Sequence, residues 1–167
     1  MITMKPYAAF GYVIFVCDAT PTDVRQVRVV NGHYDNGYIY YTKGLAYAIL
    51  DRTGEILHER KPGWLHTGES GTKDSGTLHI TYAESTQWVC IPRDKNFRGL
   101  PNLESLAFNV GENISMPIGT SIFLVNGSVT ISGRTFVGPS QIRVRLADAI
   151  ATVTESGYGL KFLQNAE

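Results

Sequence analysis

Apolar and polar residues alternate along most of this chain in short runs, the pattern of β-strands with one face in a core and one face outside it. The alternation is clearest in Thr77–Tyr82 and Gln141–Leu146, where every second side chain is apolar. Similar runs recur at short intervals, separated by glycine, asparagine and proline, and almost no segment has helical periodicity. The expected fold is therefore all-β, a jelly-roll β-sandwich or barrel with at most one short helix.

The segment from Gly111 to Val137 gives the most specific structural prediction. Asn126-Gly127 is a strong signal for a hairpin turn, and Ser132-Gly133 is a weaker one. If both are two-residue loops, three strands form a meander with one wholly apolar face, which a slip of one residue would destroy. On that face Leu124 is expected opposite Val129, Ile122 opposite Ile131, and Val129 opposite Phe136. The other face then carries Ser128, Thr130, Thr135, Phe123, Val125 and Val137.

Local signals elsewhere predict single elements. The apolar run Tyr7–Cys17 is expected to form one long first strand. Thr20–Asp23, with Pro21 at its second position, is expected to begin a helix of one or two turns. Asp35-Asn36-Gly37 predicts a loop, and residues 61–76, rich in glycine, serine and threonine, predict a long exposed one.

At 167 residues, the default organisation is a single β-rich domain spanning residues 1–167. Pro92–Leu103 is polar and is interrupted by two prolines. The alternative is therefore two packed sub-sheets, residues 1–92 and 104–167, joined by the Pro-rich segment 92–103.

The chain has a formal net charge of +0, with 15 basic and 15 acidic residues. This balance argues against a nucleic-acid partner, which requires clustered positive charge. The N-terminal apolar run has no cleavage site of a signal peptide and is too short to span a bilayer, so no membrane partner is expected. Cys17 and Cys90 lie in apolar, strand-like runs, and are expected to be buried and reduced, with a single disulfide between them as the alternative.

One motif points to a fold family. Gly111, Pro117, Gly119, Ile122 and Asn126 follow the spacing of the second cupin motif, in which a metal-binding histidine stands where this chain has Ile122. The first cupin motif needs a His-x-His pair, and no two histidines here have that spacing. The stretch resembles a cupin motif without its ligands, which implies a cupin-like jelly roll with no metal and no cofactor. The four histidines are His33, His58, His66 and His79.

The whole chain also resembles small cupin-like, β-rich proteins of tailed bacteriophages. The resemblance lies in GYIYY (37–41), WVCIPR (88–93) and GENISMPIGTSIFLVNG (111–127). It implies a structural protein of a virion, in the tail or as a head accessory or decoration component. It also implies a homo-oligomer or other virion proteins as partners. The expected location is the virion, assembled in the host cytoplasm, or otherwise the cytoplasm.

No catalytic residues are predicted, because no serine, cysteine or histidine has the neighbours that acid–base or nucleophilic chemistry needs. The sequence does contain aromatic, apolar and basic residues that could contact a partner or a ligand. Trp64 is the most prominent, since a tryptophan in a Pro/Gly loop either packs back into a core or docks on a partner. The full set is Trp64, Tyr38, Tyr40, Tyr41, Phe123, Val125, Val137, Arg143 and Arg145.

Three functions follow in order of preference. The first is a non-catalytic, self-associating structural or assembly protein of a phage particle. The alternative is a jelly-roll module that binds a small ligand, a carbohydrate or a nucleotide. The third is a metal-independent isomerase of cupin-like fold, which ranks last because the sequence offers no acid–base pair.

Overall fold

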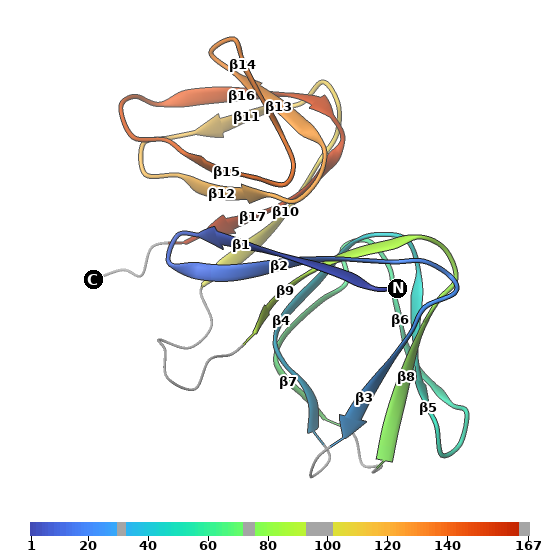
Figure 1. Cartoon of the computed structure of the whole chain (residues 1–167). Helices are drawn as coiled ribbons and strands as arrows, with labels where there is room; N and C mark the ends of the chain where they lie inside the picture. Colours follow the sequence, from blue (N-terminus) through green and yellow to red (C-terminus); the bar gives the residue numbers. More distant parts are fainter. Residues whose placement is uncertain (30–32, 72–75, 93–101, 164–167) are drawn as a thin grey trace. The chain divides into compact units, whose positions relative to one another are not determined.

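The computed structural model describes residues 1–29, 33–71, 76–92 and 102–163, which form 17 strands and no helix (Figure 1). The all-β prediction is confirmed. No helix in these ranges is long and apolar enough to cross a membrane. The strands are β1 (Thr3–Ala9), β2 (Tyr12–Ala19), β3 (Val24–Val29), β4 (His33–Lys43), β5 (Ala46–Leu50), β6 (Ile56–Arg60), β7 (Leu65–Gly71), β8 (Gly76–Tyr82), β9 (Thr86–Pro92), β10 (Leu103–Phe108), β11 (Asn113–Met116), β12 (Ser121–Leu124), β13 (Ser128–Ile131), β14 (Arg134–Val137), β15 (Ser140–Arg143), β16 (Ala149–Glu155) and β17 (Gly157–Phe162).

The chain divides into two compact units. The first unit comprises Met1–Tyr7 and Val13–Leu100, and the second comprises Ala8–Tyr12 and Pro101–Glu167. Each unit has its own pair of sheets and its own buried apolar core.

The first unit pairs a five-stranded sheet, β1-β2-β9-β4-β7, with a four-stranded sheet, β3-β8-β5-β6. Strand β5 shows how the core forms: Ala46, Ala48 and Leu50 are buried, and the residues between them are only partly buried. Every second side chain therefore enters the core, as the sequence alternation predicts. The core residues are Cys17, Ala19, Val27, Ile39, Tyr41, Ala46, Ala48, Leu50, Leu78, Ile80, Tyr82 and Trp88.

The second unit pairs two four-stranded sheets, β10-β17-β12-β15 and β11-β16-β13-β14. Its core takes residues from both sheets, namely Phe108, Met116, Ile122, Leu124, Val129, Ile142, Val144, Ala151 and Val153. The apolar face predicted for the Gly111–Val137 segment lies in this core, with Ile131 and Phe136 packed against it as partly buried residues.

The two predicted hairpin turns have different outcomes. The Ser132-Gly133 turn is confirmed: both residues have positive φ, 49° and 78°, and Val129 pairs with Phe136. The Asn126-Gly127 hairpin is wrong, because β12 pairs with β15 and β17 rather than with β13. Leu124 and Val129 still share a core, but they do so from opposite sheets.

The Asn126-Gly127 segment is instead a corner where the chain passes from one sheet to the other. The Asn126 side-chain oxygen accepts a hydrogen bond from the backbone N of Tyr158 at 2.8 Å. Gly127 has φ 81°, and a Cβ there would come within 2.8 Å of the carbonyl oxygen of Glu155. The same dipeptide that favours a hairpin therefore also fits a corner packed tightly against the β16–β17 connection.

Several local predictions in the first half are corrected. The predicted first strand is broken by a turn at Phe10-Gly11, where both residues have positive φ, so it forms β1 and β2. Thr20–Asp23 closes a turn rather than starting a helix, because the Thr20 backbone N donates to the Asp23 carboxylate at 2.8 Å and β3 follows directly. Asp35-Asn36-Gly37 lies within β4, at a register shift. In the predicted loop 61–76, residues 65–71 form β7, and 72–75 lie outside the described residues.

Candidate functional site

Trp64 ends the turn that joins β6 to β7, and its ring lies among four side chains. The His58 ring stacks on it with 5.2 Å between centroids, and the His66 ring lies at 6.1 Å. The guanidinium carbon of Arg60 is 4.6 Å from the Trp64 ring centroid, and the Tyr41 ring meets it edge-on at 5.7 Å. Backbone bonds join the same turn to β4, since Tyr41 N donates to the Trp64 carbonyl oxygen at 2.9 Å. Trp64 therefore packs back against the core of the first unit.

Arg60 is the most unusual member of this group, because its side chain is 0% exposed. Its Nη1 donates to the Tyr41 hydroxyl oxygen at 3.3 Å, and its guanidinium lies 5.5 Å from the Tyr41 ring centroid. A guanidinium stays charged, so burying it is unfavourable unless polar and aromatic groups surround it. The surrounding sequence, EILHER at residues 55–60, is mostly polar and does not indicate that Arg60 is buried. Because the charge is sealed from solvent, the group closes a core rather than forming an open binding site.

The tyrosines of β4 are also internal. Tyr38 and Tyr40 share one face of the strand, Tyr41 lies on the other, and all three are buried. Burial, with a smaller effect of the neighbouring Tyr40, raises the pKa of Tyr38 above its usual value. None of the three rings is offered at the surface as a contact for a ligand or partner.

The apolar candidates of the second unit separate into two groups. Phe123 and Val125 are 1% and 0% exposed, which corrects the expectation that they face outward. Val137 is 61% exposed and remains a surface residue. Arg143 and Arg145 are both exposed, as the alternation with buried Ile142 and Val144 predicted. The guanidinium of Arg143 lies 5.2 Å from the Phe10 ring centroid.

Val137 belongs to a surface that the sequence did not single out, the outer face of the sheet β11-β16-β13-β14. One row of polar side chains crosses all four strands in register: Asn113 opposite Thr152, Thr152 opposite Thr130, and Thr130 opposite Thr135. Thr152 Oγ1 donates to Asn113 Oδ1 at 2.9 Å, and the Thr130 and Thr135 hydroxyls are 3.2 Å apart.

The rows beside it continue the same composition. The hydroxyl of Ser128, a residue that is only 4% exposed, lies 2.6 Å from that of Thr154, and Ile150 is 66% exposed. No side chain of this set is charged. We call the set the hydroxyl face; it consists of Asn113, Ser115, Ser128, Thr130, Thr135, Val137, Ile150, Thr152 and Thr154.

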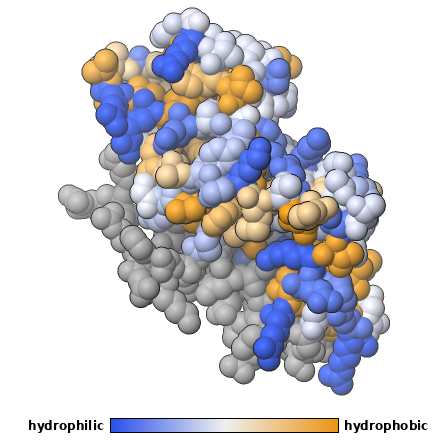
Figure 2. Space-filling view, in the orientation of Figure 1, coloured by the Kyte–Doolittle hydropathy of each residue, from blue (hydrophilic) through white to orange (hydrophobic). Residues whose placement is uncertain are grey.

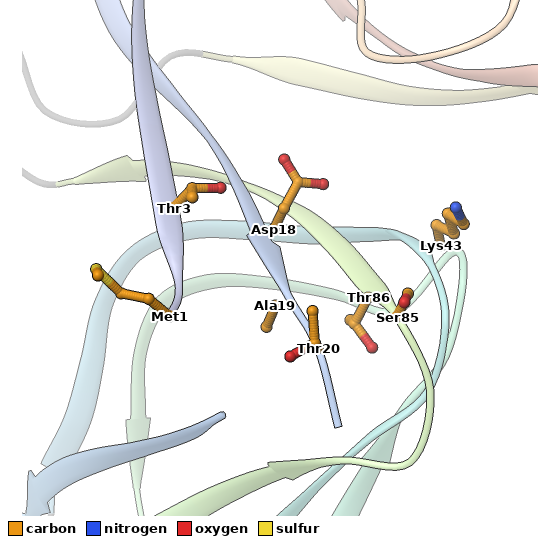
Figure 3. A pocket seen from close by; sticks show the side chains of 8 residues that line it. All are labelled: Met1, Thr3, Asp18, Ala19, Thr20, Lys43, Ser85 and Thr86. Atoms are coloured by element: carbon orange, nitrogen blue, oxygen red, sulfur yellow. The ribbon is translucent and has the colours of Figure 1, made fainter. Parts of the chain in front are cut away.

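A second surface feature is an open pocket of about 260 Å³ in the first unit, which we call the rim pocket (Figure 3). It combines the side-chain carboxylate of Asp18 and the side-chain ammonium of Lys43 with several hydroxyls. Asp18 and Lys43 lie on strands β2 and β4, on either side of β9, and both pair in register with Gln87. The lining residues are Met1, Thr3, Asp18, Ala19, Thr20, Lys43, Ser85 and Thr86.

The described residues contain no group of three or more His, Cys, Asp or Glu side chains placed to hold a metal ion. Ile122, at the position of the cupin histidine, is a core residue of the second unit. His79 is bonded through Nδ1 to the Asp51 carboxylate, and its Nε2 lies 3.1 Å from the Gln26 amide nitrogen. Both of its ring nitrogens are therefore engaged on the outer face of the sheet.

Cys17 and Cys90 lie on the neighbouring strands β2 and β9, and no disulfide joins them. Cys17 belongs to the core, and Cys90 packs against it as a partly buried residue. Burial, followed by the neighbouring Cys90, raises the pKa of the Cys17 thiol to about 12. A thiol with so high a pKa is not a nucleophile near neutral pH.

This chain resembles known proteins in its fold. No protein-family model matches the sequence, and no match to a curated protein was found. The bacterial pirin YhhW from Escherichia coli, in a nickel(II) complex, is 14% identical, with a TM-score of 0.52 over 99% of this chain and 92% of that one. HutD from Pseudomonas fluorescens SBW25 is 12% identical, with a TM-score of 0.50 over 97% of this chain and 86% of that one. A cupin 2 conserved barrel domain protein from Leptotrichia buccalis is 12% identical, with a TM-score of 0.49 over 98% and 88% of the two chains. The chain has a cupin-like jelly-roll fold.

Proposed function

We propose that this chain is a non-catalytic structural protein that associates with copies of itself, as an accessory component of a bacteriophage particle. The observation that carries the proposal is the hydroxyl face of the second unit. Three hydrogen bonds join its polar side chains in pairs, Ser128 with Thr154, Thr130 with Thr135 and Thr152 with Asn113, so most of these side chains are already held in place. Such a surface loses little further conformational freedom when a partner covers it.

The charge pattern favours a second copy of this chain as the partner. The nine side chains are uncharged, and Glu155, which pairs in register with Ser128, places a carboxylate at one edge of the face, so two copies can bring these nine side chains together without burying an ion at the centre of the contact. The chain as a whole has a net charge of +0, which removes long-range repulsion between copies. On the side of the molecule seen in Figure 2, hydrophobic and hydrophilic side chains are interspersed, so the visible side offers no broad apolar patch as a competing interface.

The size of the hydroxyl face favours assembly in a particle over an isolated dimer. Its nine side chains are fewer than the roughly 20–30 residues that each partner contributes to a standard stable interface. A contact between two hydroxyl faces is weak by itself, and further contacts elsewhere in a particle would reinforce it. The resemblance of the chain to small phage proteins supports a virion as that assembly.

Native mass spectrometry and sedimentation velocity of the purified chain test the proposal. We expect oligomers whose fraction rises with protein concentration. Thr152→Lys places a charge at the centre of the hydroxyl face and should shift the population to monomer. Ala147→Lys adds the same charge to an exposed loop of the same unit, outside the face, and should leave the oligomers unchanged.

A chain that stays monomeric at high concentration would overturn the self-association. Oligomers that persist in Thr152→Lys, or that are lost equally in Ala147→Lys, would place the interface elsewhere. Fractionation of virions that carry this chain, followed by peptide mass spectrometry, tests the particle separately: its absence from virions would refute the phage role.

A further inference from the structure

The rim pocket has a chemistry that the assembly role does not use. The opposed charges of Asp18 and Lys43 come from strands on either side of β9, so their backbones are roughly 10 Å apart, two strand spacings. Figure 3 shows both charged ends directed to the same side of the sheet, with the hydroxyl of Thr3 turned toward Asp18. A ligand lying across β9 would therefore meet an acceptor at one end and a donor at the other.

The backbone beneath the rim pocket is held firmly. Gly44 has φ +86°, and a Cβ there would lie 2.4 Å from the Ser85 carbonyl oxygen and 2.5 Å from the Thr86 hydroxyl, so the β8–β9 turn packs directly on it. The Thr86 hydroxyl donates to the Glu84 carbonyl oxygen at 2.8 Å. On the other side of the pocket, Thr20 is fixed through its backbone N, which donates to Asp23. The wall positions are thus set before any ligand arrives, which favours binding.

The lining selects the kind of ligand. The charges of Asp18 and Lys43 cancel, and the N-terminal ammonium of Met1 is paired with the Asp23 carboxylate at 2.6 Å, so the pocket gives no net attraction to an anion or a cation. A carboxylate only accepts hydrogen bonds, an ammonium only donates them, and serine and threonine hydroxyls do both. Sugar hydroxyls can match all three kinds of group, because each one donates and accepts.

We propose that the rim pocket binds one neutral sugar residue, free or at the end of a glycan, with Asp18 accepting from and Lys43 donating to its hydroxyls. A pocket of about 260 Å³ suits one such residue better than a drug-sized molecule, for which pockets start at roughly 300 Å³. The affinity is expected to be weak, on the order of millimolar, because the pocket is open and its charged groups are solvated. This inference is independent of the proposed self-association, which uses the second unit.

Ligand-observed NMR with the full chain, using glucose, galactose, mannose and N-acetylglucosamine separately, tests the inference. We expect saturable binding of at least one sugar. Asp18→Asn and Lys43→Gln should each weaken it by about tenfold or more, the usual effect of losing a hydrogen bond to a charged group. Glu84→Gln and Lys5→Gln are matched controls, because both remove an exposed charge of the same unit outside the pocket lining, and they should bind as the parent does.

Three results would overturn the inference. The first is that none of the four sugars binds at saturating concentration. The second is that a sugar binds to Asp18→Asn as tightly as to the parent. The third is that glycine, tested as a small zwitterion, binds while no sugar does. Equal melting temperatures for the parent and all four variants would ensure that lost binding reflects the site and not the fold. Sugar binding that survives in the monomeric Thr152→Lys variant would separate this site from the hydroxyl face.

Discussion

Arg60 is the side chain on which the ring contacts at the β6–β7 edge of the first unit converge. It lies against both Tyr41 and Trp64, with its charge sealed from solvent. Both tryptophans of the chain, Trp64 and Trp88, belong to or pack against the same core. Tryptophan fluorescence therefore reports on the first unit alone.

We expect Arg60→Ala to destabilise the first unit by about 3–5 kcal/mol, since it removes the packing over two rings, leaves a cavity, and takes a hydrogen-bond donor away from the Tyr41 hydroxyl. Arg60→Met should cost less, because it fills much of the space without burying a charge. Urea unfolding followed by tryptophan fluorescence measures both. Equal urea midpoints of unfolding for the parent and Arg60→Ala would show that the Arg60 guanidinium is not enclosed by the core.

Cys17 supplies a prediction for alkaline pH. Its thiol pKa rises on folding from 9.0 to about 12. Between these values the unfolded chain has lost the proton and the native chain keeps it, so stability falls as pH rises. We expect the parent to lose about 1 kcal/mol more than Cys17→Ala between pH 8 and pH 10. The pKa values of Tyr38 and Tyr82 are also raised, but both tyrosines are present in the parent and in Cys17→Ala. Their contribution to the pH dependence of stability therefore cancels when the two proteins are compared. Identical pH profiles would contradict the burial of the thiol.

At the scale of single elements, two glycines of the first unit provide a matched pair. Gly44 and Gly54 both have positive φ, 86° and 73°, but a Cβ would collide with the β8–β9 turn only at Gly44. We expect Gly54→Ala to lower the free energy of unfolding by about 1–2 kcal/mol through backbone strain alone. Gly44→Ala should lower it clearly more, because the collision with the turn adds to the strain. Thermal unfolding of the two variants tests this order. Similar losses would mean that the turn can move away from Gly44.

Most of the strands could be predicted from their sequence, because alternation with a period of two depends only on which side chains enter a core. Which strands pair could not. Ser132-Gly133 and Asn126-Gly127 are similar turn dipeptides, but the second is held by Tyr158, more than 30 residues away, a contact that no local signal reveals. The burial of Arg60 could not be predicted for the same reason, since this charged residue enters the core only because rings distant in the sequence surround it.

The surface features were harder still to predict. The hydroxyl face requires Asn113, Thr130, Thr135 and Thr152 to line up across four strands, and only the alternation of Thr130 and Thr135 was visible beforehand. The rim pocket joins residues from β1, β2, β4, the β8–β9 turn and the start of β9. Neither set is contiguous in the sequence.

At the scale of the whole molecule, the balance of charge and the uncharged hydroxyl face predict how association responds to salt. An interface without ions should keep its dissociation constant nearly unchanged between low and high ionic strength, since screening acts only on charges. Sedimentation velocity at several salt concentrations measures this. Oligomers that dissociate as salt is added would indicate that Arg143, Arg145 or other charged residues form the contact.

The corner at Asn126-Gly127 has a consequence for how the second unit is made on the ribosome. Among the described strands of its two sheets, only β13 and β14 are paired neighbours joined by a two-residue turn, whereas β10 pairs with β17, and β11 with β16, which are synthesised much later. Such distant pairings slow folding to roughly milliseconds to seconds. A nascent chain would carry β10 to β12 unpaired, with their core residues open to other molecules, until β15 to β17 have been synthesised.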